Sequence, residues 1–344
     1  DELDYFKNGG ILHYVLRQLA GKKAALSVTF PRHEKAASAA FLLCGIRACQ
    51  FIEHMLKWAY PSVCMHPFMS TNYPWLSSYS PSTPHEVDLE EFPSIISVLE
   101  HAINKFSDRP AFSNLGKTLS YRQIDELSTQ FANYLIHELK LKKGERVAIM
   151  LPNLLQYPIA IFGVLRAGLT VVNTNPLYTE RELKHQLIDS GATVLVVLEN
   201  FASVAQEVLA ETKVRQVITT SIGEMLGPKG LLVNFVLKYV KQAVPSFDLP
   251  DAISFKEALK RGARHTLPSV SIQPSEIAFL QYTGGTTGVS KGAMLSHRNL
   301  LFACHCYYAD IDRIGPQDTI LHAAPLTHGS GLYGLAYVAK GGHN

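Results

Sequence analysis

A short run of glycine, threonine and serine around one lysine is the part of the sequence best suited to chemistry. Residues 282–293 read YTGGTTGVSKGA and hold four glycines, three threonines, one serine and one lysine. Glycine lets the backbone turn with positive φ and approach a ligand closely, and successive N–H groups in such a turn form a concave anion site. Hydroxyl and ammonium groups add further donors. The run therefore predicts a loop that binds phosphate.

The candidate phosphate ligands are consecutive residues whose backbone or side chain can donate a hydrogen bond. They are Thr283, Gly284, Gly285, Thr286, Thr287, Gly288, Val289, Ser290 and Lys291. A hydrogen bond to a charged group contributes about 1.5–3 kcal/mol, so a few of them can hold a triphosphate. A Walker A loop is disfavoured, because that motif has Gly before its Lys and Ser or Thr after it, whereas here Ser290 precedes Lys291 and Gly292 follows it. A polar surface hairpin is the remaining alternative.

The segments around this loop alternate between strand-like and helix-like patterns, which indicates how the loop is positioned. Apolar runs predict strands at 146–151, 169–173, 193–198 and 276–281, the last of which leads into the loop. Helical periodicity predicts helices at 126–139, 156–168 and 180–190. Alternating strands and helices at this spacing predict an α/β fold, with helices covering a largely parallel sheet and right-handed crossovers.

Composition and charge narrow the function classes. The chain has 344 residues, of which 47% are hydrophobic and 18% charged, as expected for a globular protein with a sizeable core. A net charge of +3 on this length does not favour a nucleic-acid partner. The five cysteines match neither a zinc-site spacing nor a disulfide framework, so reduced thiols are expected. The acidic first residues have the wrong sign for an export signal, and we expect a cytoplasmic protein.

The string YTGGTTGVSKGAMLSHRNL resembles the phosphate-binding signature of the adenylate-forming enzymes, which include acyl-CoA synthetases, luciferases and the adenylation domains of peptide synthetases. Residues 73–299 resemble bacterial long-chain fatty acid–CoA ligases in particular. The segments that carry this resemblance include LSYRQIDELSTQFANYL, RVAIMLPNLLQYPIAIFGVLRAGLTVVNTNPLYTERELKHQL and LVNFVLKYVKQAVPSFDLPDAISFKEAL. The resemblance implies part of the adenylate-forming N-terminal domain, with helix-covered, largely parallel sheets.

The same resemblance implies the reaction and its cofactors. A fatty acid carboxylate attacks the α-phosphate of Mg-ATP to give acyl-AMP, and coenzyme A then displaces AMP. Residues of the predicted loop would hold the β- and γ-phosphates. Pro325-Leu326-Thr327-His328 resembles the segment that shapes the acyl pocket, which places His328 near the acyl carboxylate, while a packed core histidine stays an open alternative.

No residue of this chain is assigned to catalysis or to the metal. The resemblance places the catalytic lysine, the glutamate that helps hold Mg²⁺ and the aspartate that binds the ribose beyond Asn344. We therefore expect the 344-residue chain alone not to form acyl-CoA at a useful rate. The favoured function is that of a fatty acid–CoA ligase. The alternatives are a ligase for a different carboxylic acid and a non-catalytic module that binds nucleotide or lipid.

Three pieces are distinguished along the chain. Residues 1–20 resemble the C-terminus of an aconitase, and residues 21–68 match no recognised family. We expect these two pieces to be a fused or read-through leader, because the ligase resemblance begins just after Met69. Residues 69–344 are then the partial AMP-binding domain. Within it, residues 310–344 resemble a different branch of acyl-CoA synthetases, so ordinary divergence and a recombined junction both stay open.

The segment 231–244 has two interpretations. Asn234, Lys238 and Lys241 fall on one helical stripe and apolar residues fill the rest. A helix packed on the protein's own core is the favoured interpretation. The alternative is a surface helix that lies on an acidic membrane face, where fatty acids partition, and this would make the protein peripheral on the inner face of the membrane. The other partner considered is a second copy of this chain, which would form a homodimer.

Overall fold

The computed structural model describes residues 73–81, 83–283, 289–310, 314–329, 331 and 334–344. The chain divides into two compact units, residues 1–73 and 74–344, and the second unit contains the predicted phosphate loop. The proposed leader pieces 1–20 and 21–68 lie outside the described residues.

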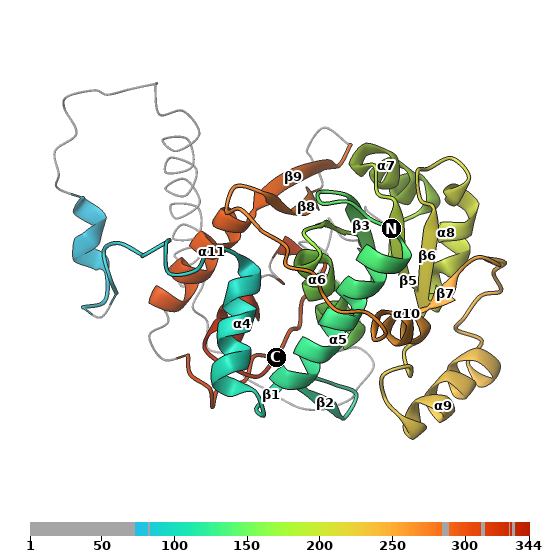
Figure 1. Ribbon diagram of the computed structural model, residues 1–344, viewed down its shortest axis with the longest axis horizontal. Coiled ribbons are helices and arrows are strands. Elements are labelled where there is room, and N and C mark those ends of the chain that lie inside the picture. Colours follow the sequence, from blue (N-terminus) through green and yellow to red (C-terminus); the bar gives the residue numbers. More distant parts are fainter. Residues whose placement is uncertain (1–72, 82, 284–288, 311–313, 330, 332–333) are drawn as a thin grey trace, which may run out of the picture. The chain divides into compact units, whose positions relative to one another are not determined.

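A seven-stranded sheet forms the centre of the second unit (Figure 1). Its strands are β3 (Arg146–Met150), β4 (Thr170–Asn173), β5 (Val194–Leu198), β6 (Gln216–Thr220), β7 (Ile253–Ser254), β8 (Ile277–Thr283) and β9 (Lys291–Ser296). They lie in the order β7-β6-β5-β3-β4-β8-β9, and all neighbours are parallel except β8 and β9, which form an antiparallel pair. A separate two-stranded sheet pairs β1 (Pro110–Asn114) with β2 (Lys117–Ser120).

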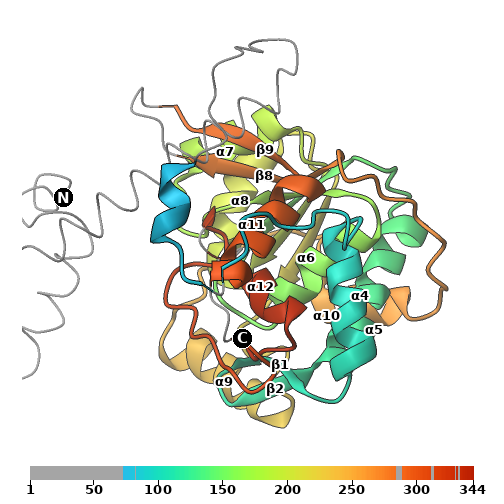
Figure 2. The ribbon, with the colours of Figure 1, turned by 90° about the vertical axis from the view of Figure 1, so that its left-hand side faces the viewer.

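Helices cover both faces of the large sheet (Figures 1 and 2). The helices of the described residues are α4 (Ile95–Phe106), α5 (Tyr121–Asn133), α6 (Gln156–Arg166), α7 (Glu180–Ser190), α8 (Ala202–Leu209), α9 (Pro228–Phe235), α10 (Phe255–Gly262), α11 (His297–Asp310) and α12 (Gly334–Ala339), of which α9 does not pack on the sheet. Shorter helical turns are η1 (Pro74–Ser78), η2 (Tyr134–Glu138), η3 (Glu199–Phe201) and η4 (Val236–Val240).

Alternating side chains of the strands divide the core into two layers. On β3, Val147 and Ile149 pack with residues of α4, α5, α6 and α10, whereas Ala148 and Met150 pack with residues of α7 and α8. This follows from the two-residue period of a strand, whose successive side chains point to opposite faces. A sheet buried on both faces needs nearly continuous apolar strands, and all five residues of β5 are buried.

The predicted α/β fold is confirmed, and most of its elements lie where the sequence placed them. The predicted helix 180–190 matches α7, and the predicted strand 146–151 matches β3 to within one residue. The helix predicted from residue 126 begins earlier, at Tyr121. Ser120 caps it: its side chain accepts from the backbone N–H of Gln123, whose own side chain accepts from Ser120 N–H.

The expectation that residues 231–244 pack on the core is wrong. This segment forms α9 and η4 on the surface, and Gly230 is the only fully buried residue of the two elements. Leu231 is 77% exposed and Tyr239 is 63% exposed. In the part of the chain that the structure describes, no helix combines the length and the apolar character needed to cross a membrane.

Candidate functional site

The two ends of the predicted phosphate loop meet where the loop joins the strands of the β8–β9 hairpin. Thr283, the last residue of β8, lies directly opposite Lys291, the first residue of β9. Directly opposite residues of an antiparallel pair project from the same face, so the hydroxyl and the ammonium point to one side of the hairpin. Both residues are exposed, as is Val289, while Ser290 is half-buried. The other predicted ligands, 284–288, lie outside the described residues.

One face of helix α7 holds this hairpin in place. Nε2 of His185 donates to the backbone carbonyl of Ser290 over 3.0 Å, and the hydroxyl of Tyr282 donates to Oδ2 of Asp189 over 2.5 Å. His185 and Asp189 are four residues apart, which places them on the same side of the helix. The helix thus contacts β8 and the residue that immediately precedes β9, and its own start is fixed by a capping box between Thr179 and Glu182.

The ring of Tyr282 lies against a glycine on the facing strand. Gly292 is the register partner of Tyr282, and a Cβ atom at that position would come within 2.9 Å of the ring. Any larger residue at 292 would force the ring or the facing strand to shift. Burial, and then the neighbouring Asp189, raise the pKa of Tyr282 well above its usual value. The phenol therefore stays protonated and donates to Asp189 at physiological pH.

The hairpin's own side chains suit an anion. Residues 282–296 contain no aspartate or glutamate, and their polar groups are hydroxyl, ammonium and backbone N–H donors. Such a donor set fits the phosphates of ATP better than it fits a bare cation. Among the residues that the structure describes, no group of three or more His, Cys, Asp or Glu side chains could hold a metal ion.

A buried polar network lies beside the hairpin, at the carboxyl ends of β4 and β8. Asn173 faces Gln281 across the two parallel strands, and its Nδ2 donates to the Gln281 Oε1 atom over 2.8 Å. The hydroxyl of Tyr157, on α6, lies 2.8 Å from Oδ1 of Asn173. All three side chains are buried, and burial raises the pKa of Tyr157, which keeps its hydroxyl protonated. The network is therefore a set of neutral groups with fixed partners.

The network attaches the segment Pro325–His328 to the sheet. Nε2 of Gln281 donates to the carbonyl of Thr327 over 2.9 Å, and the Tyr157 hydroxyl lies 2.7 Å from the carbonyl of Leu326. Oδ1 of Asn153 accepts from the N–H of Leu326 over 2.8 Å. The structure thus brings the predicted acyl-pocket segment to the same edge of the sheet as the phosphate loop.

The side chain of His328 is exposed, so the core-histidine alternative is wrong. Its backbone N–H donates to the carbonyl of Pro325 over 3.0 Å, which closes a turn and presents the imidazole at the surface of this edge. Its role toward a substrate stays a prediction. An apolar pocket opens beside the segment. Its lining includes Phe112, Ile161, Phe162, Phe279, Leu326 and Leu335.

Sequence reasoning missed several residues that build this site, namely Asn153, Tyr157, Asn173, His185 and Gln281. A signal was present for Asn173 and Gln281, because each is a polar residue at the carboxyl end of an apolar strand. In open α/β sheets ligands bind outside these strand ends. No comparable signal exists for His185, since only the packing of α7 against the hairpin brings it to Ser290.

Comparison with known proteins gives consistent matches. The family model described as AMP-binding enzyme matches residues 99–344. A long-chain-fatty-acid–CoA ligase of Salmonella typhimurium is 46% identical over 282 residues, covering 78% of this chain and 49% of the relative. A long-chain-fatty-acid–CoA ligase of Yersinia pestis is 50% identical over 258 residues, covering 74% and 46%. The chain therefore spans about half the length of the curated relatives it matches.

A similar structure supports the same fold. The crystal structure of a long-chain-fatty-acid-CoA ligase from Archaeoglobus fulgidus superposes with a TM-score of 0.60 at 26% identity. The superposition covers 77% of this chain and 48% of that one. The structure of an anthranilate CoA ligase in complex with anthranoyl-AMP gives a TM-score of 0.62 at 17% identity, which bears on the fold alone.

Proposed function

The chain belongs to the family of AMP-binding enzymes, and we propose that it forms the ATP- and fatty-acid-binding part of a long-chain fatty acid–CoA ligase. Such an enzyme joins a fatty acid carboxylate to the α-phosphate of ATP with release of pyrophosphate, and then transfers the acyl group to coenzyme A. ATP, with Mg²⁺ on its phosphates, supplies the reactive phosphoryl centre, and coenzyme A supplies the thiol.

The hairpin performs the phosphate-binding role in this proposal. Thr283 and Lys291 donate to the β- and γ-phosphates together with Ser290 and the glycine-rich backbone between them. Catalysis of phosphoryl chemistry of this kind rests mainly on positioning and on stabilising negative charge. His185 and Asp189 act as positioning residues, because His185 holds Ser290, next to β9, and Asp189 holds Tyr282 of β8, each through a hydrogen bond.

The polar network and the apolar pocket perform the acyl-binding role. The network fixes the segment Pro325–His328 beside the hairpin, so the exposed imidazole of His328 would lie near the fatty acid carboxylate. The neighbouring pocket is lined mainly by aliphatic and aromatic side chains, with His322 among them, and this lining suits a few carbons of an aliphatic chain. The names of the relatives at 46% and 50% identity support a fatty acid over an aryl or amino acid.

One observation carries the proposal. The side chains of Thr283 and Lys291 project from the same side of the β8–β9 hairpin, where its glycine-rich loop begins and ends, and helix α7 holds this hairpin through a hydrogen bond. The test is ATP–pyrophosphate exchange with palmitate, benzoate or leucine, measured on this chain joined to the remaining half of a relative, because the chain spans about half the length of the relatives it matches. Exchange that depends on palmitate supports the proposal. Exchange only with benzoate or leucine indicates a ligase for a different acid, and ATP binding without exchange with any acid indicates a nucleotide-binding module.

The proposed substrate bears on the location of the protein, and the oligomeric state is a separate question. We propose a cytoplasmic protein that meets its fatty acid at the inner face of the membrane, where long acyl chains partition. Sedimentation velocity would test the homodimer considered from the sequence, which stays a prediction.

A further inference from the structure

Helix α9 and the turn η4 are attached to the domain through a polar and glycine-lined side. Nδ2 of Asn234 donates to the Ser221 hydroxyl over 2.7 Å, and its Oδ1 accepts from the N–H of Gly223 over 2.8 Å. Gly230 approaches the carbonyl of Gly223 so closely that a Cβ atom on it would lie 1.7 Å away. The side of the helix that meets the protein is thus the side that carries Asn234.

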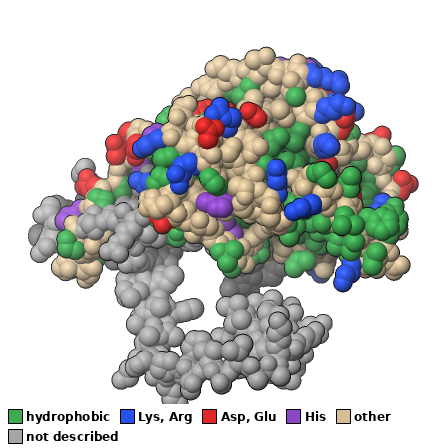
Figure 3. Space-filling view, turned by 90° about the horizontal axis from the view of Figure 1, so that it is seen from below, with side chains coloured by type: hydrophobic (Ala, Val, Ile, Leu, Met, Phe, Trp, Pro, Cys, Tyr) green, Lys and Arg blue, Asp and Glu red, His purple; other side chains and the backbone are tan. Residues whose placement is uncertain are grey.

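The opposite side of this helix is apolar and faces water. Its stripe consists of Leu231, Phe235 and Tyr239, spaced four residues apart, with Leu232 and Val240 beside them. Their exposed fractions lie between 55% for Phe235 and 77% for Leu231. Seen from below, hydrophobic side chains form a dense patch on the side of the molecule where α9 lies (Figure 3). A surface helix of a globular protein ordinarily turns such a stripe toward the core.

The charged side chains within this segment are all of one sign. Residues 225–247 contain three lysines, Lys229, Lys238 and Lys241, and no aspartate or glutamate. All three lysines are exposed. The ammonium of Lys238 lies 5.9 Å from the centre of the Tyr239 ring, and that ring lies 5.1 Å from the ring of Phe235. An exposed apolar stripe with aromatic rings and a basic margin suits an interface between water and lipid.

We propose that residues 228–241, here called the α9 face, dock on the surface of an anionic lipid bilayer. Leu231, Phe235 and Tyr239 enter the boundary between headgroups and acyl chains, and the lysines contact anionic headgroups. A second copy of this chain is a less suitable partner for the α9 face than a bilayer is. A two-fold interface would set the α9 face against itself and bring six lysines together without an acidic residue from residues 225–247 to neutralise them. The inference stands on this surface and does not require ligase activity.

Vesicle co-sedimentation of the full chain tests the apolar part of the proposal. Vesicles of phosphatidylcholine alone are compared with vesicles that also contain about 30 mol % phosphatidylglycerol. We expect binding to the anionic vesicles, and loss of about tenfold or more of it in the triple variant L231S/F235S/Y239S. The matched control is L177S/M294S/L321S, which changes side chains that are 69–88% exposed elsewhere. Equal binding of both triple variants and the unsubstituted chain overturns the proposal.

The lysines are tested in the same assay. The variant K229Q/K238Q/K241Q should lose most of the preference for phosphatidylglycerol, whereas K117Q/K142Q/K213Q, with exposed lysines elsewhere, should keep it. Raising the salt concentration should weaken binding of the unsubstituted chain and have little effect on the first variant. A preference for anionic vesicles that survives in K229Q/K238Q/K241Q contradicts the proposal.

Two further measurements separate lipid from protein as the occupant. Phe235→Trp places a fluorophore on the α9 face, and brominated lipid should quench it, with the unsubstituted chain as background. Sedimentation velocity then compares the unsubstituted chain with L231S/F235S/Y239S. The outcome that contradicts the proposal has two parts: the unsubstituted chain is a dimer whereas L231S/F235S/Y239S is a monomer, and brominated lipid does not quench the fluorophore. The α9 face is then a protein interface and the proposal is wrong.

Discussion

Two regions of this molecule depart from the usual distribution of polar and apolar side chains, and they do so in opposite directions. At the carboxyl ends of β4 and β8, Tyr157, Asn173 and Gln281 are polar and buried. On α9, the apolar side chains of Leu231 and Phe235 are exposed. Such departures are expected where a fold serves a function, because another molecule completes the surface there. We propose that ATP and a fatty acid complete the first region and that a bilayer completes the second.

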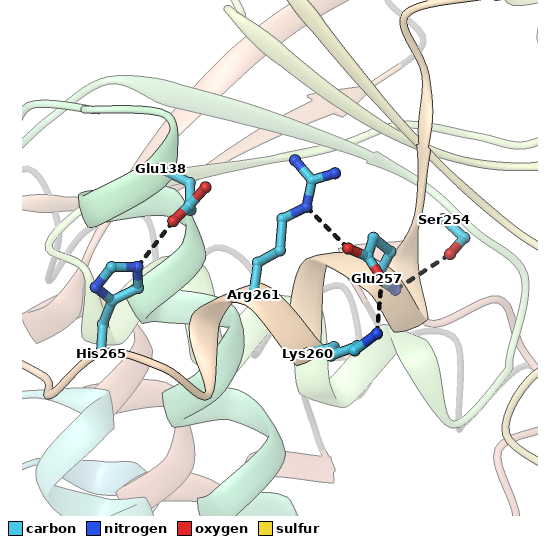
Figure 4. A network of polar contacts seen from close by, with 6 residues as sticks. All are labelled: Glu138, Ser254, Glu257, Lys260, Arg261 and His265. Atoms are coloured by element: carbon cyan, nitrogen blue, oxygen red, sulfur yellow. Dashed lines mark hydrogen bonds and ion pairs between the residues drawn. The ribbon is translucent and has the colours of Figure 1, made fainter.

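Helix α10 shows the ordinary arrangement between these extremes. Phe255, Ala258 and Leu259 are buried, and the charged residues lie on the other side. Figure 4 shows this polar side: Ser254 caps the helix by accepting from the N–H of Glu257, whose carboxylate pairs with Arg261 over 3.0 Å. Apolar side chains of α10 and of α9 should therefore differ sharply in what they contribute to stability.

The largest expected effect comes from comparing one phenylalanine on each helix. Phe255→Ala removes a fully buried ring that lies 4.9 Å from the ring of Phe131, and should lower the free energy of unfolding by about 3–5 kcal/mol. Phe235→Ala on α9 should change it by less than about 0.5 kcal/mol. Urea unfolding of both variants measures the difference. A comparable loss in Phe235→Ala would show that α9 packs on the domain and would remove the contrast.

A buried histidine elsewhere in the domain should make the stability of the fold depend on pH, whereas α9 contains no histidine. His297, at the start of α11, is 2% exposed, and its Nδ1 accepts from the N–H of Ile95. Burial lowers the pKa of His297 to about 4 from an unfolded value of 6.5, against the opposing effect of Glu276. Between these values the unfolded state binds more protons, so stability should fall by up to about 3 kcal/mol as the pH drops from above 6.5 to 4.

Urea unfolding as a function of pH checks this prediction. His297→Gln should flatten the dependence between pH 4 and 6.5, while His85→Gln, at an exposed position, should leave it unchanged. An unaltered pH dependence in His297→Gln would mean that another group controls acid stability.

The polar network should be costly to interrupt. Gln281→Leu removes the partner of the Asn173 side chain and of the Thr327 carbonyl, and leaving a buried polar group unpaired costs about 1–3 kcal/mol. Gln273→Leu, at an exposed position, is the matched control and should be nearly neutral. Thermal unfolding compares them. If both substitutions are neutral, the network does not hold the acyl-pocket segment.

These contrasts also show what the sequence could reveal. The sheet follows from apolar strands such as 146–150 and 194–198, because that signal is local. The phosphate loop was predicted from an equally local signal, its glycines and hydroxyls, and stays a prediction. The pairing of Asn173 with Gln281 is not local, since it depends on strand order across 108 positions of the chain. The orientation of α9 was likewise hidden. An amphipathic pattern does not say which side of a helix meets the protein. In α9 it is the side of Asn234, whose amide forms a hydrogen bond to Ser221.

A smaller effect is expected from removing the hydrogen bond by which α7 holds the β8–β9 hairpin. His185→Ala removes the donor to the Ser290 carbonyl and should weaken ATP binding by about tenfold, because one positioning hydrogen bond contributes about 1 kcal/mol. His185→Gln can still donate and should restore most of the affinity, which a purely steric role would not explain. Calorimetry on both variants measures this. Equal affinity in all three proteins would leave α7 without a role in the site.

The most direct measurement is the ATP affinity of the Lys291→Met variant by titration calorimetry. Lys213→Met, another exposed lysine outside the hairpin, is the control. Our account predicts that Lys291→Met weakens ATP binding by about ten- to hundredfold, which corresponds to the loss of one hydrogen bond to a charged group, while Lys213→Met binds as the unsubstituted chain does. If Lys291→Met and the unsubstituted chain bind ATP equally well, the β8–β9 hairpin is not the phosphate site.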